Sequence, residues 1–252
     1  PYIQRIIQEW LLYVSAFRGQ TISIRELHLG GGTPTFFSPT HLTALLEGIF
    51  QHAVAHPELE MSFEGHPNNT SEAHLAALYD MGFRRVSFGV QDLDPEVQRL
   101  IGRIQPLENL VRVTEQARLK GYNSINYDLI YGLPLQTAEK LQVTLQEVIK
   151  LRPDRIAFYG YAHVPWKSRA QRLYDESHLP SPDARMALYE QGREAFLAAG
   201  YLDIGMDHFA LPEDGLVQAY QTKQLHRNFM GYTAQPTRML LGLGVSAISD
   251  LG

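Results

Sequence analysis

The sequence comprises 252 residues, carries a formal net charge of −5 and contains no cysteine. With 44% hydrophobic and 19% charged residues, it can build the core of one large domain or two small ones. The lack of cysteine excludes disulfides, a cysteine nucleophile, a cysteine-ligated zinc site and an iron–sulfur cluster held by these residues alone. The mildly acidic charge argues against general nucleic-acid binding, and no apolar run approaches the roughly 18 residues of a membrane span.

Strands and helices are expected to alternate along the chain. Short apolar-rich segments predict strands at 22–29, 60–64, 84–90, 123–130, 155–161 and 202–206. The helices between them are expected to begin at Ser38, Thr70 or Ser71, Asp94, Pro106, Thr137 and Ser181. Weak periodicity assigns no element to 210–238, and the glycine-broken apolar run from Met239 to Ile248 predicts a last strand.

This alternation predicts parallel strands joined by right-handed crossovers. It leaves open a doubly wound sheet and a βα barrel, whole or partial. We find no internal repeat, low-complexity tract or linker, so residues 1–252 are treated as one unit. Because the sequence starts at Pro1 without Met and stops at Gly252 just after an apolar run, we expect both ends to be cuts through a longer protein.

Polar and glycine residues gather where the predicted strands end. They are Gly30 to Thr33, Glu64, His66, Gln91, Asp92, Asp128, Ala162, His163, Asp207 and His208. In βα barrels the chemistry takes place at this edge, so we expect one shared site at the mouth of the barrel. The alternative for each residue alone is that it caps a helix or fixes a loop.

The run Gly30-Gly31-Gly32 follows the first predicted strand. Neither a dinucleotide-binding fingerprint nor a phosphate-binding loop matches it. Backbone without side chains leaves N–H and C=O groups open, which suits the ammonium and carboxylate of an amino acid. The alternative is a tight connection between strand and helix.

Three charged residues invite a functional interpretation. Glu64 could be a general acid or base, a metal ligand, an ammonium partner or one half of a salt bridge. Asp128 is flanked by apolar residues and needs a partner, for which a ribose diol or an arginine would serve. Arg103 could bind a ligand, or it could be solvated at the end of a helix.

The histidines raise the question of a metal site. We expect His41, His52, His56 and His74 to lie solvated on helix surfaces, and His28, His66, His163 and His208 near strand ends. No His-x-His or His-Glu-x-x-His motif occurs, which argues against a zinc hydrolase. No predicted strand ends in lysine, which argues against a Schiff-base aldolase.

Several blocks together resemble a known family. They are Leu27-His28-Leu29-Gly30-Gly31-Gly32-Thr33-Pro34-Thr35, Glu64, Ser87-Phe88-Gly89-Val90-Gln91-Asp92 and Asp128-Leu129-Ile130-Tyr131-Gly132-Leu133-Pro134. They resemble the radical S-adenosylmethionine (SAM) enzymes of the oxygen-independent coproporphyrinogen III oxidase family, over about Tyr2 to Gly252. Haem-chaperone relatives share the early blocks. The later blocks at 161–165, 205–210, 226–233 and 242–249 look specific to the oxidase.

The resemblance implies an α/β fold, a partial (β/α)6 barrel of radical SAM type, with its first strand and cluster loop absent from this sequence. Residues 1–252 would form the catalytic barrel core, truncated at both ends, and 200–252 would complete its substrate and SAM side. The implied cofactors are SAM and a [4Fe-4S] cluster held by three cysteines of a loop after the first strand. The implied reaction converts two propionates of coproporphyrinogen III to vinyl groups by hydrogen abstraction, loss of CO2 and loss of an electron, giving protoporphyrinogen IX.

The resemblance also assigns binding residues, although it assigns no catalytic side chain. It implies that Gly31 and Glu64 hold the methionyl part of the cluster-bound SAM and that Ile248 holds its adenine. The positions implied for a second SAM are Gly32, Thr33, Gln91, Arg103, Asp128 and Ala162. Arg227 and Arg238 could pair with substrate propionates, or they could be surface arginines. The partners implied are coproporphyrinogen III and an external electron donor and acceptor, without nucleic acid or membrane, for a monomer in the cytoplasm.

The missing cysteines are the departure from the family pattern. One explanation is truncation, with the cluster ligands ahead of Pro1; the other is a natural relative that binds porphyrin without radical chemistry. We expect truncation, and we expect these residues alone to be unable to reduce SAM. An unrelated barrel hydrolase with zinc at His66, His163 or His208 remains a third hypothesis.

Overall fold

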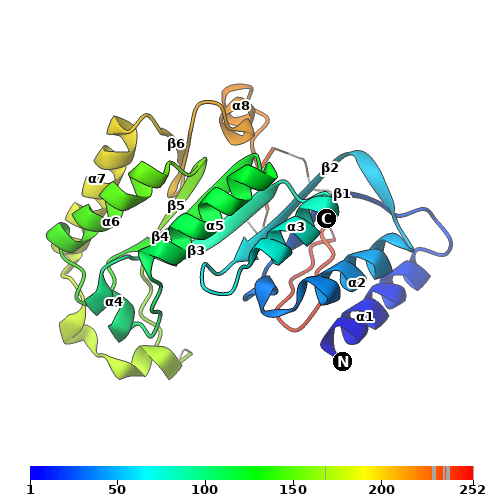
Figure 1. The fold of residues 1–252 in the computed structure, drawn as a ribbon, viewed down its shortest axis with the longest axis horizontal. Helices are drawn as coiled ribbons and strands as arrows, with labels where there is room; N and C mark the ends of the chain where they lie inside the picture. Colours follow the sequence, from blue (N-terminus) through cyan, green and yellow to red (C-terminus); the bar gives the residue numbers. More distant parts are fainter. Residues whose placement is uncertain (168, 229–230, 235, 237–238, 252) are drawn as a thin grey trace.

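A curved seven-stranded sheet forms the centre of the computed structural model, which describes residues 1–167, 169–228, 231–234, 236 and 239–251. From one edge to the other its strands are β1 (Ser23–Leu29), β2 (Val54–Gly65), β3 (Arg85–Gln91), β4 (Ser124–Tyr131), β5 (Arg155–Gly160), β7 (His208–Ala210) and β6 (Leu202–Gly205). Strands β1 to β5 are parallel (Figure 1), whereas β7 pairs antiparallel with both of its neighbours.

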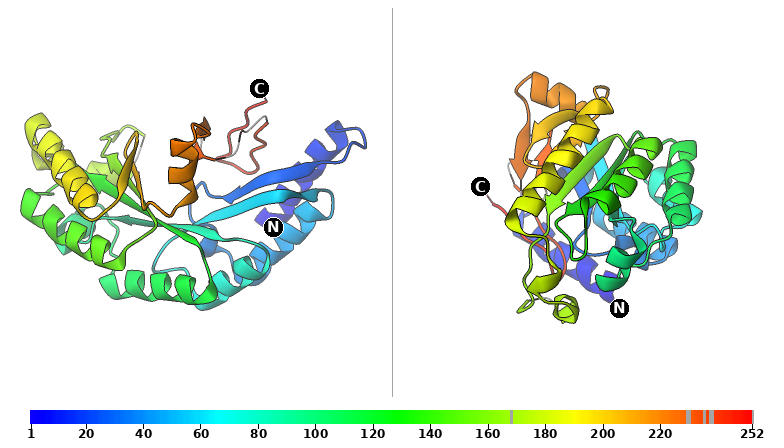
Figure 2. Two further views of the ribbon diagram at one scale, coloured as in Figure 1. Left: turned by 90° about the horizontal axis from the view of Figure 1, so that it is seen from above. Right: turned by 90° about the vertical axis from the view of Figure 1, so that its left-hand side faces the viewer.

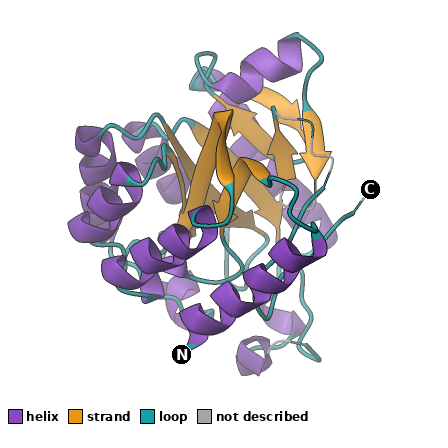
Figure 3. Cartoon of the chain, turned by 90° about the vertical axis from the view of Figure 1, so that its right-hand side faces the viewer, coloured by secondary structure: helices purple, strands orange, loops and turns teal. Residues whose placement is uncertain are grey.

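Most helices cover the convex side of this sheet (Figure 2). They are α1 (Tyr2–Ala16), α2 (Pro39–Phe50), α3 (Glu72–Asp80), α5 (Leu107–Lys120), α6 (Ala138–Leu151) and α7 (Pro182–Ala198). The short helix α8 (Gly215–Gln221) lies on the concave side, so the strands stand between it and the main helix layer (Figure 2). Figure 3 shows the strands with helices packed around them. The remaining elements are α4 (Pro95–Leu100), the 3-10 turns η1 (Pro34–Phe36), η2 (Arg169–Leu173) and η3 (Glu176–His178), and the hairpin of β8 (His226–Asn228) and β9 (Gly231–Thr233).

The main core lies between the sheet and the convex helices. Every second strand residue faces this layer, and those that are almost fully buried include Phe63, Val86, Phe88, Ile125, Tyr127, Ile156 and Phe158. The helices contribute Leu42, Leu46, Leu75, Leu78, Leu110, Val113, Leu145 and Val148. Because each such side chain contributes about 1.5–3 kcal/mol on burial, this interface stabilises the barrel wall.

Capping residues set the helix boundaries much as the sequence predicts. The side chains of Ser38, Asp94, Thr137 and Ser181 accept hydrogen bonds from backbone N–H groups of the first turns of α2, α4, α6 and α7. Of the two residues considered for α3, Ser71 is the cap. Helix α5 ends at Gly121, whose φ of 107° places it in the left-handed region.

The predicted α/β fold with a mostly parallel sheet is confirmed, with one correction at the β6 edge. Strand β6 does not pair with β5, because β7 inserts between them in antiparallel orientation. Two antiparallel pairings leave β6 running in the same direction as β5. The turn after Gly205 therefore still lies toward the carboxyl edge of the sheet, as expected.

Three other predictions about elements need correction. Helix α1 was not predicted, and β2 starts at Val54 rather than at residue 60. The predicted strand from Met239 to Ile248 is wrong, because this segment forms only one isolated bridge, between Leu240 and Asp250. Its backbone N–H groups instead donate to side chains: Gly242 to Ser249, Gly244 to Glu9 and Val245 to Tyr2.

Two further facts bear on the site. Strand β1 pairs only with β2 within the described part of the chain, so its outer edge carries no ladder there. Among the residues that the structure describes, no helix is long and apolar enough to cross a membrane.

Candidate functional site

The concave face of the sheet is polar. Its side chains occupy the strand positions that alternate with the core, and those lining the cavity there include Glu26, His28, Ser62, Glu64, Arg85, Ser87, Ser124, Asn126, Asp128, Arg155, Ala157 and Tyr159. The cavity measures about 270 Å3, and His208, Leu216, Tyr232 and Thr233 close it from the C-terminal part. A polar interior in a parallel sheet departs from the usual apolar one, which marks this face as the candidate site.

The lower layer of this face, defined as Glu60, Arg85, Ser124, Arg155 and Asp214, lies toward the amino ends of the strands. Arg85 Nη1 donates to Glu60 Oε2 at 2.9 Å. Arg155 holds Asp214 with Nε at 2.8 and 2.9 Å from the two carboxylate oxygens and Nη2 at 2.7 Å from Oδ1. Ser124 Oγ donates to the same carboxylate at 3.0 Å. The charged side chains of the lower layer therefore form ion pairs with one another.

Asp214 also ties α8 to the barrel, because it caps that helix through the backbone N–H of Leu216 at 2.7 Å. Burial alone would raise the pKa of Asp214, but the charge of Arg155 and the hydrogen bonds from Arg155, Leu216 and Ser124 hold it below its ordinary value. Burial lowers the pKa of Arg85, which still stays protonated at neutral pH. The lower layer is thus an ion-paired support for the C-terminal segment.

The upper layer, defined as Glu64, Gln91, Arg103 and Asp128, lies toward the carboxyl ends of the strands. Asp128 accepts one hydrogen bond at each oxygen, from Ser87 Oγ and Asn126 Nδ2, both at 2.8 Å. Burial raises the pKa of Asp128; Ser87 and Asn126 counteract this, Glu64 adds to it, and Arg103 opposes it. Each carboxylate oxygen accepts up to two hydrogen bonds, so Asp128 keeps acceptor capacity for a ligand.

Arg103 takes its place in the upper layer through neutral partners. Its Nε donates to Gln105 Oε1 at 2.8 Å, and its Nη2 donates to the carbonyl of Gly89 at 3.0 Å. Gly89 pairs in register with Asp128, and a Cβ on Gly89 would lie 2.7 Å from Arg103 Nη2 and 3.0 Å from Gln91 Nε2. The structure thus gathers Gln91, Arg103 and Asp128 around one bare glycine.

The glycine turn lies beside Glu64. A Cβ on Gly30 would meet His28 Nε2 at 2.6 Å and Glu64 Oε1 at 2.9 Å, so a larger residue there would displace these two side chains. Gly31 and Gly32 have φ values of +74° and +151°, and Gly32 has no neighbour within 4 Å of an added Cβ. The backbone of the turn is open to a ligand at this point.

His28 bridges Ser62 and Glu64. Its Nδ1 lies 2.8 Å from Ser62 Oγ, and its Nε2 lies 3.5 Å from Glu64 Oε1. Glu64 remains 41% exposed at its side chain, so the carboxylate is held on one side and reachable on the other.

The C-terminal segment meets the same turn. A Cβ on Gly31 would lie 3.7 Å from Cβ of Ser246, two residues before Ile248, which is partly exposed. Gly31, Glu64 and the segment of Ile248 therefore lie near one another, as the first set of predicted residues requires.

The rest of the second set is less closely gathered. Thr33 precedes η1, and Ala162 follows β5, where its carbonyl accepts a 3.2 Å hydrogen bond from Gln171 Nε2. Of the residues predicted to bind SAM or substrate, Glu64 and Asp128 line the cavity itself, and so does His208 from the strand-end set. Arg227 is exposed beside Met206, with its guanidinium 5.9 Å from the centre of the Tyr232 ring, and Arg238 lies outside the described residues.

Predictions about three polar side chains are wrong. His74 is buried rather than solvated, with Nε2 2.8 Å from the carbonyl of Phe37, and His56 lies on β2 rather than on a helix. Asp92 belongs to the structure rather than to the mouth, because it is fully buried and accepts hydrogen bonds from Asp94, Gln136 and Thr144. The part of the chain that the structure describes holds no group of three or more acidic or histidine side chains suited to a metal ion.

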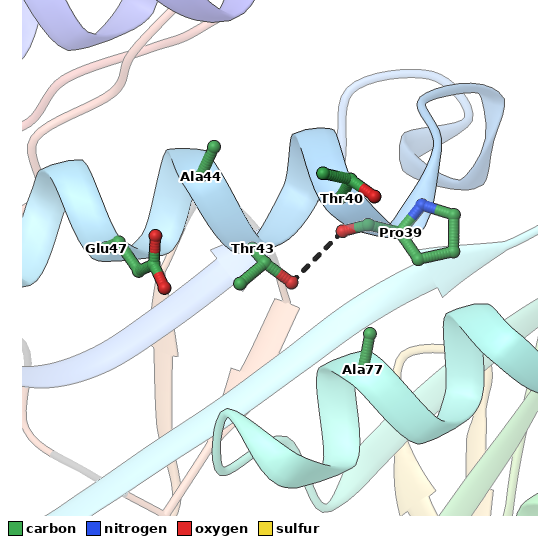
Figure 4. Close-up of a pocket in the computed structure, with 6 residues that line it drawn as sticks. All are labelled: Pro39, Thr40, Thr43, Ala44, Glu47 and Ala77. Carbon is green, nitrogen blue, oxygen red and sulfur yellow. Dashed lines mark hydrogen bonds between the residues drawn. The ribbon is translucent and has the colours of Figure 1, made fainter.

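A second hollow, of about 420 Å3, lies between α2 and α3 on the convex side (Figure 4). Pro39, Thr40, Thr43, Ala44, Glu47 and Ala77 line it. The Thr43 hydroxyl donates to the carbonyl of Pro39 at 3.1 Å. Among the residues that line the hollow, Glu47 alone is charged. Despite its size, this hollow lacks the converging polar groups of a ligand site.

Sequence reasoning missed the lower layer and Tyr159, whose pKa burial raises to about 12. The signal was present as alternation of polar and apolar residues inside the strands, for example Glu60, Ser62 and Glu64 on one face of β2. A search for polar residues at the strand ends alone does not detect this alternation.

A mostly parallel barrel wall with a glycine turn after its first strand and polar strand ends defines the class of protein. The chain belongs to the radical SAM superfamily, whose family model matches residues 1–148.

Within that superfamily the chain is a homologue of oxygen-independent coproporphyrinogen III oxidases. It is 44% identical over 229 residues to that of Paracoccus denitrificans, covering 90% of this chain and 51% of the relative, and 42% identical over 254 residues to that of Pseudomonas aeruginosa, covering 100% and 55%. The solved structure of coproporphyrinogen III oxidase from Escherichia coli matches 98% of this chain and 57% of its own, with a TM-score of 0.93 at 40% identity. The chain thus spans about half the length of the curated relatives that it matches.

Proposed function

We propose that this chain is the SAM- and substrate-binding barrel of an enzyme that converts two propionates of coproporphyrinogen III to vinyl groups, giving protoporphyrinogen IX in haem biosynthesis. The observation that carries the proposal is the TM-score of 0.93 to the Escherichia coli oxidase, combined with an upper layer that keeps free binding capacity. The substrate, the electron donor and the electron acceptor are part of the proposal.

The upper layer fits SAM. The bare backbone at Gly30 to Gly32 offers hydrogen-bonding groups to an amino acid, and the Glu64 carboxylate is open to its ammonium. The remaining acceptor capacity of Asp128 suits ribose hydroxyls. When bound, SAM supplies the hydrogen-abstracting radical chemistry of the superfamily.

The chain's own residues do not fit an iron–sulfur cluster. No thiolate is available because the sequence has no cysteine, and no group of three metal-binding side chains occurs among the described residues. We therefore assign no step to a cluster on these residues. Any cluster in the whole protein would need ligands from elsewhere, and the outer edge of β1, which pairs with no strand among the described residues, is a place where a further parallel strand could pair.

His28 has a positioning role in this proposal. Its contact with Ser62 fixes the ring, and its Nε2 faces Glu64 across the space that Gly30 leaves empty. The carboxylate is thereby oriented before a ligand arrives, which reduces the entropy cost of binding.

The experiment is anaerobic turnover of coproporphyrinogen III by the whole protein supplied with iron, sulfide, SAM and a reductant. We expect protoporphyrinogen IX from the wild type and at least a tenfold lower rate from Glu64→Gln, because loss of one charge-assisted hydrogen bond costs about 1.5–3 kcal/mol. Glu58→Gln, at an exposed residue of the same strand, is the matched control and should keep the wild-type rate.

The lack of cysteine favours a second candidate, a relative that binds porphyrin without turnover. The same assay separates the two candidates. Coproporphyrin that binds and is recovered unchanged, with SAM left intact, would support the second candidate and contradict the first.

A further inference from the structure

His208 stands on the wall of the cavity opposite β1 and β2. The register pairs Asp128 with Ala157 and Ala157 with His208, so these three residues lie side by side on β4, β5 and β7. All three line the cavity. The small side chain of Ala157 therefore separates a carboxylate from an imidazole at the same level of the barrel.

The backbone fixes the tautomer of His208. Its Nδ1 lies 2.8 Å from the carbonyl oxygen of Met206, and a carbonyl can only accept, so Nδ1 carries the proton. Burial lowers the pKa of His208 and outweighs the hydrogen bond to Met206 and the charge of Asp207, which raise it; Arg155 and Arg227 add smaller lowering effects. The ring is therefore neutral at neutral pH, and Nε2 is a hydrogen-bond acceptor.

This acceptor is only loosely satisfied within the protein. Its one hydrogen-bond partner in the described residues is the Tyr159 hydroxyl at 3.4 Å, near the limit for such a bond. A Cβ on Gly231 would lie 3.9 Å from Nε2, and no side chain occupies that position. Nε2 can therefore accept a hydrogen bond from a ligand, and there is space beside it for one.

Neighbouring rings hold the imidazole in this orientation. Tyr159 and Tyr232 lie nearly perpendicular to it, with ring centres 5.7 Å and 5.2 Å away.

The turn before His208 is strained. Gly205, Met206 and Asp207 have φ values of +100°, +46° and +68°, and two of these residues carry side chains. Left-handed backbone at a residue other than glycine costs about 1–3 kcal/mol and tends to occur at functional sites. Here the strain directs the Met206 carbonyl at His208 Nδ1.

We propose that His208 Nε2 accepts a hydrogen bond from a pyrrole N–H of a porphyrinogen, and so selects the reduced tetrapyrrole over the oxidised one. The inference rests on the proposed function. A porphyrinogen offers four N–H groups on rings that can tilt, whereas a porphyrin is flat and keeps two N–H groups directed inward. A cavity of about 270 Å3 is small for a whole ligand, so we place one pyrrole ring of the substrate in it.

The test compares binding of coproporphyrinogen III and coproporphyrin III, measured anaerobically on the whole protein. The wild type should bind the porphyrinogen more tightly. His208→Phe keeps a ring between the two tyrosines but lacks the acceptor; it should weaken porphyrinogen binding about tenfold and porphyrin binding less than about threefold. His41→Gln, a control on the exposed start of α2, should keep the preference.

If His208→Phe retains the full preference for the porphyrinogen, the inference is wrong while the proposed function stands. If the wild type binds neither ligand, both fail. A readout that needs no ligand is the ¹⁵N spectrum of the wild-type histidines, assigned with the variants. The inference requires Nδ1 of His208 to be protonated and Nε2 to be bare, and a protonated Nε2 would overturn it.

Discussion

The lower and upper layers of the concave face share the strands β2, β3 and β4, yet their polar groups have different partners. In the lower layer, Arg155 and Asp214 are largely buried, with side chains 14% and 2% exposed, and each neutralises the other. In the upper layer, Glu64 is reachable from solvent, and Asp128 is held by neutral side chains rather than by a salt bridge.

This difference indicates which polar groups serve the fold and which serve a ligand. Buried charges that pair with each other are costly to separate, and they have little hydrogen-bonding capacity left for a ligand. Charges that rely on neutral donors keep the capacity to bind. Variants that alter one layer at a time test this distinction.

The largest effect is expected from Arg155→Ala. The variant leaves Asp214 buried without its counter-charge and should lower the free energy of unfolding by about 3–5 kcal/mol. Urea denaturation followed by circular dichroism measures this. A loss below about 1 kcal/mol would show that the lower layer does not support the fold as described.

Asp214→Asn should cost less, about 1.5–3 kcal/mol at neutral pH, because the amide oxygen still accepts some of these hydrogen bonds, while the charge and the second acceptor oxygen are lost. The folded-state pKa of Asp214 lies below its ordinary value. Its contribution is therefore full above the unfolded pKa and is lost as the pH falls through the folded pKa. Unfolding free energies measured from neutral to acid pH should converge for wild type and variant, and a constant gap down to the lowest pH would contradict the charge-based explanation.

Asp128→Asn makes the same substitution in the upper layer, where the pKa of the carboxyl group is shifted in the opposite direction. Burial raises the pKa of Asp128, so its ionised form carries a penalty in the folded state that is absent below the unfolded pKa and grows as pH rises toward the folded pKa. We expect the variant to be as stable as the wild type at neutral pH, within about 1 kcal/mol, or slightly more stable. A loss as large as that of Asp214→Asn would remove the distinction between the layers.

The smallest effect is expected from Lys150→Ala on the outer surface of α6. Its pair with Glu147 is exposed at the lysine and spans three residues of one helix. Thermal denaturation should show a change within about 0.5 kcal/mol. A loss of about 3 kcal/mol or more would mean that this surface pair contributes as much as the lower layer.

The sequence predicts most elements because their signals are local. Ser38, Asp94 and Thr137 cap helices whose apolar spacing is regular, and the glycine after Lys120 ends α5. Helix α1 has regular apolar spacing too, at Ile3, Ile7, Trp10 and Val14, but Pro1 offers no side-chain cap, so its start gives no signal.

Other features depend on contacts between distant residues. The run from Met239 to Ile248 has the composition of a strand, but its N–H groups find Glu9 and Tyr2 of α1, and Gly244 turns with φ +96°. The sequence around His74 predicts a surface residue. In the structure the Phe37 carbonyl, 37 residues away in sequence, accepts a hydrogen bond from its Nε2–H.

The candidate site was predictable in part for the same reason. Strand ends locate Glu64, Gln91 and Asp128, because the carboxyl edge of parallel strands is shared. The pairing of Arg155 with Asp214 across the barrel could not be foreseen, because it requires the position of α8 relative to the sheet.

The most direct test of the two-layer account uses two glutamates on one face of β2. Calorimetric titration of SAM should be performed on the whole protein as wild type, as Glu64→Gln in the upper layer and as Glu60→Gln in the lower layer. We predict that the wild type and Glu60→Gln bind SAM with similar affinity, and that Glu64→Gln binds at least about tenfold more weakly. Equal losses in both variants, or a Glu64→Gln protein that binds SAM like the wild type, would contradict the assignment of the upper layer as the ligand site.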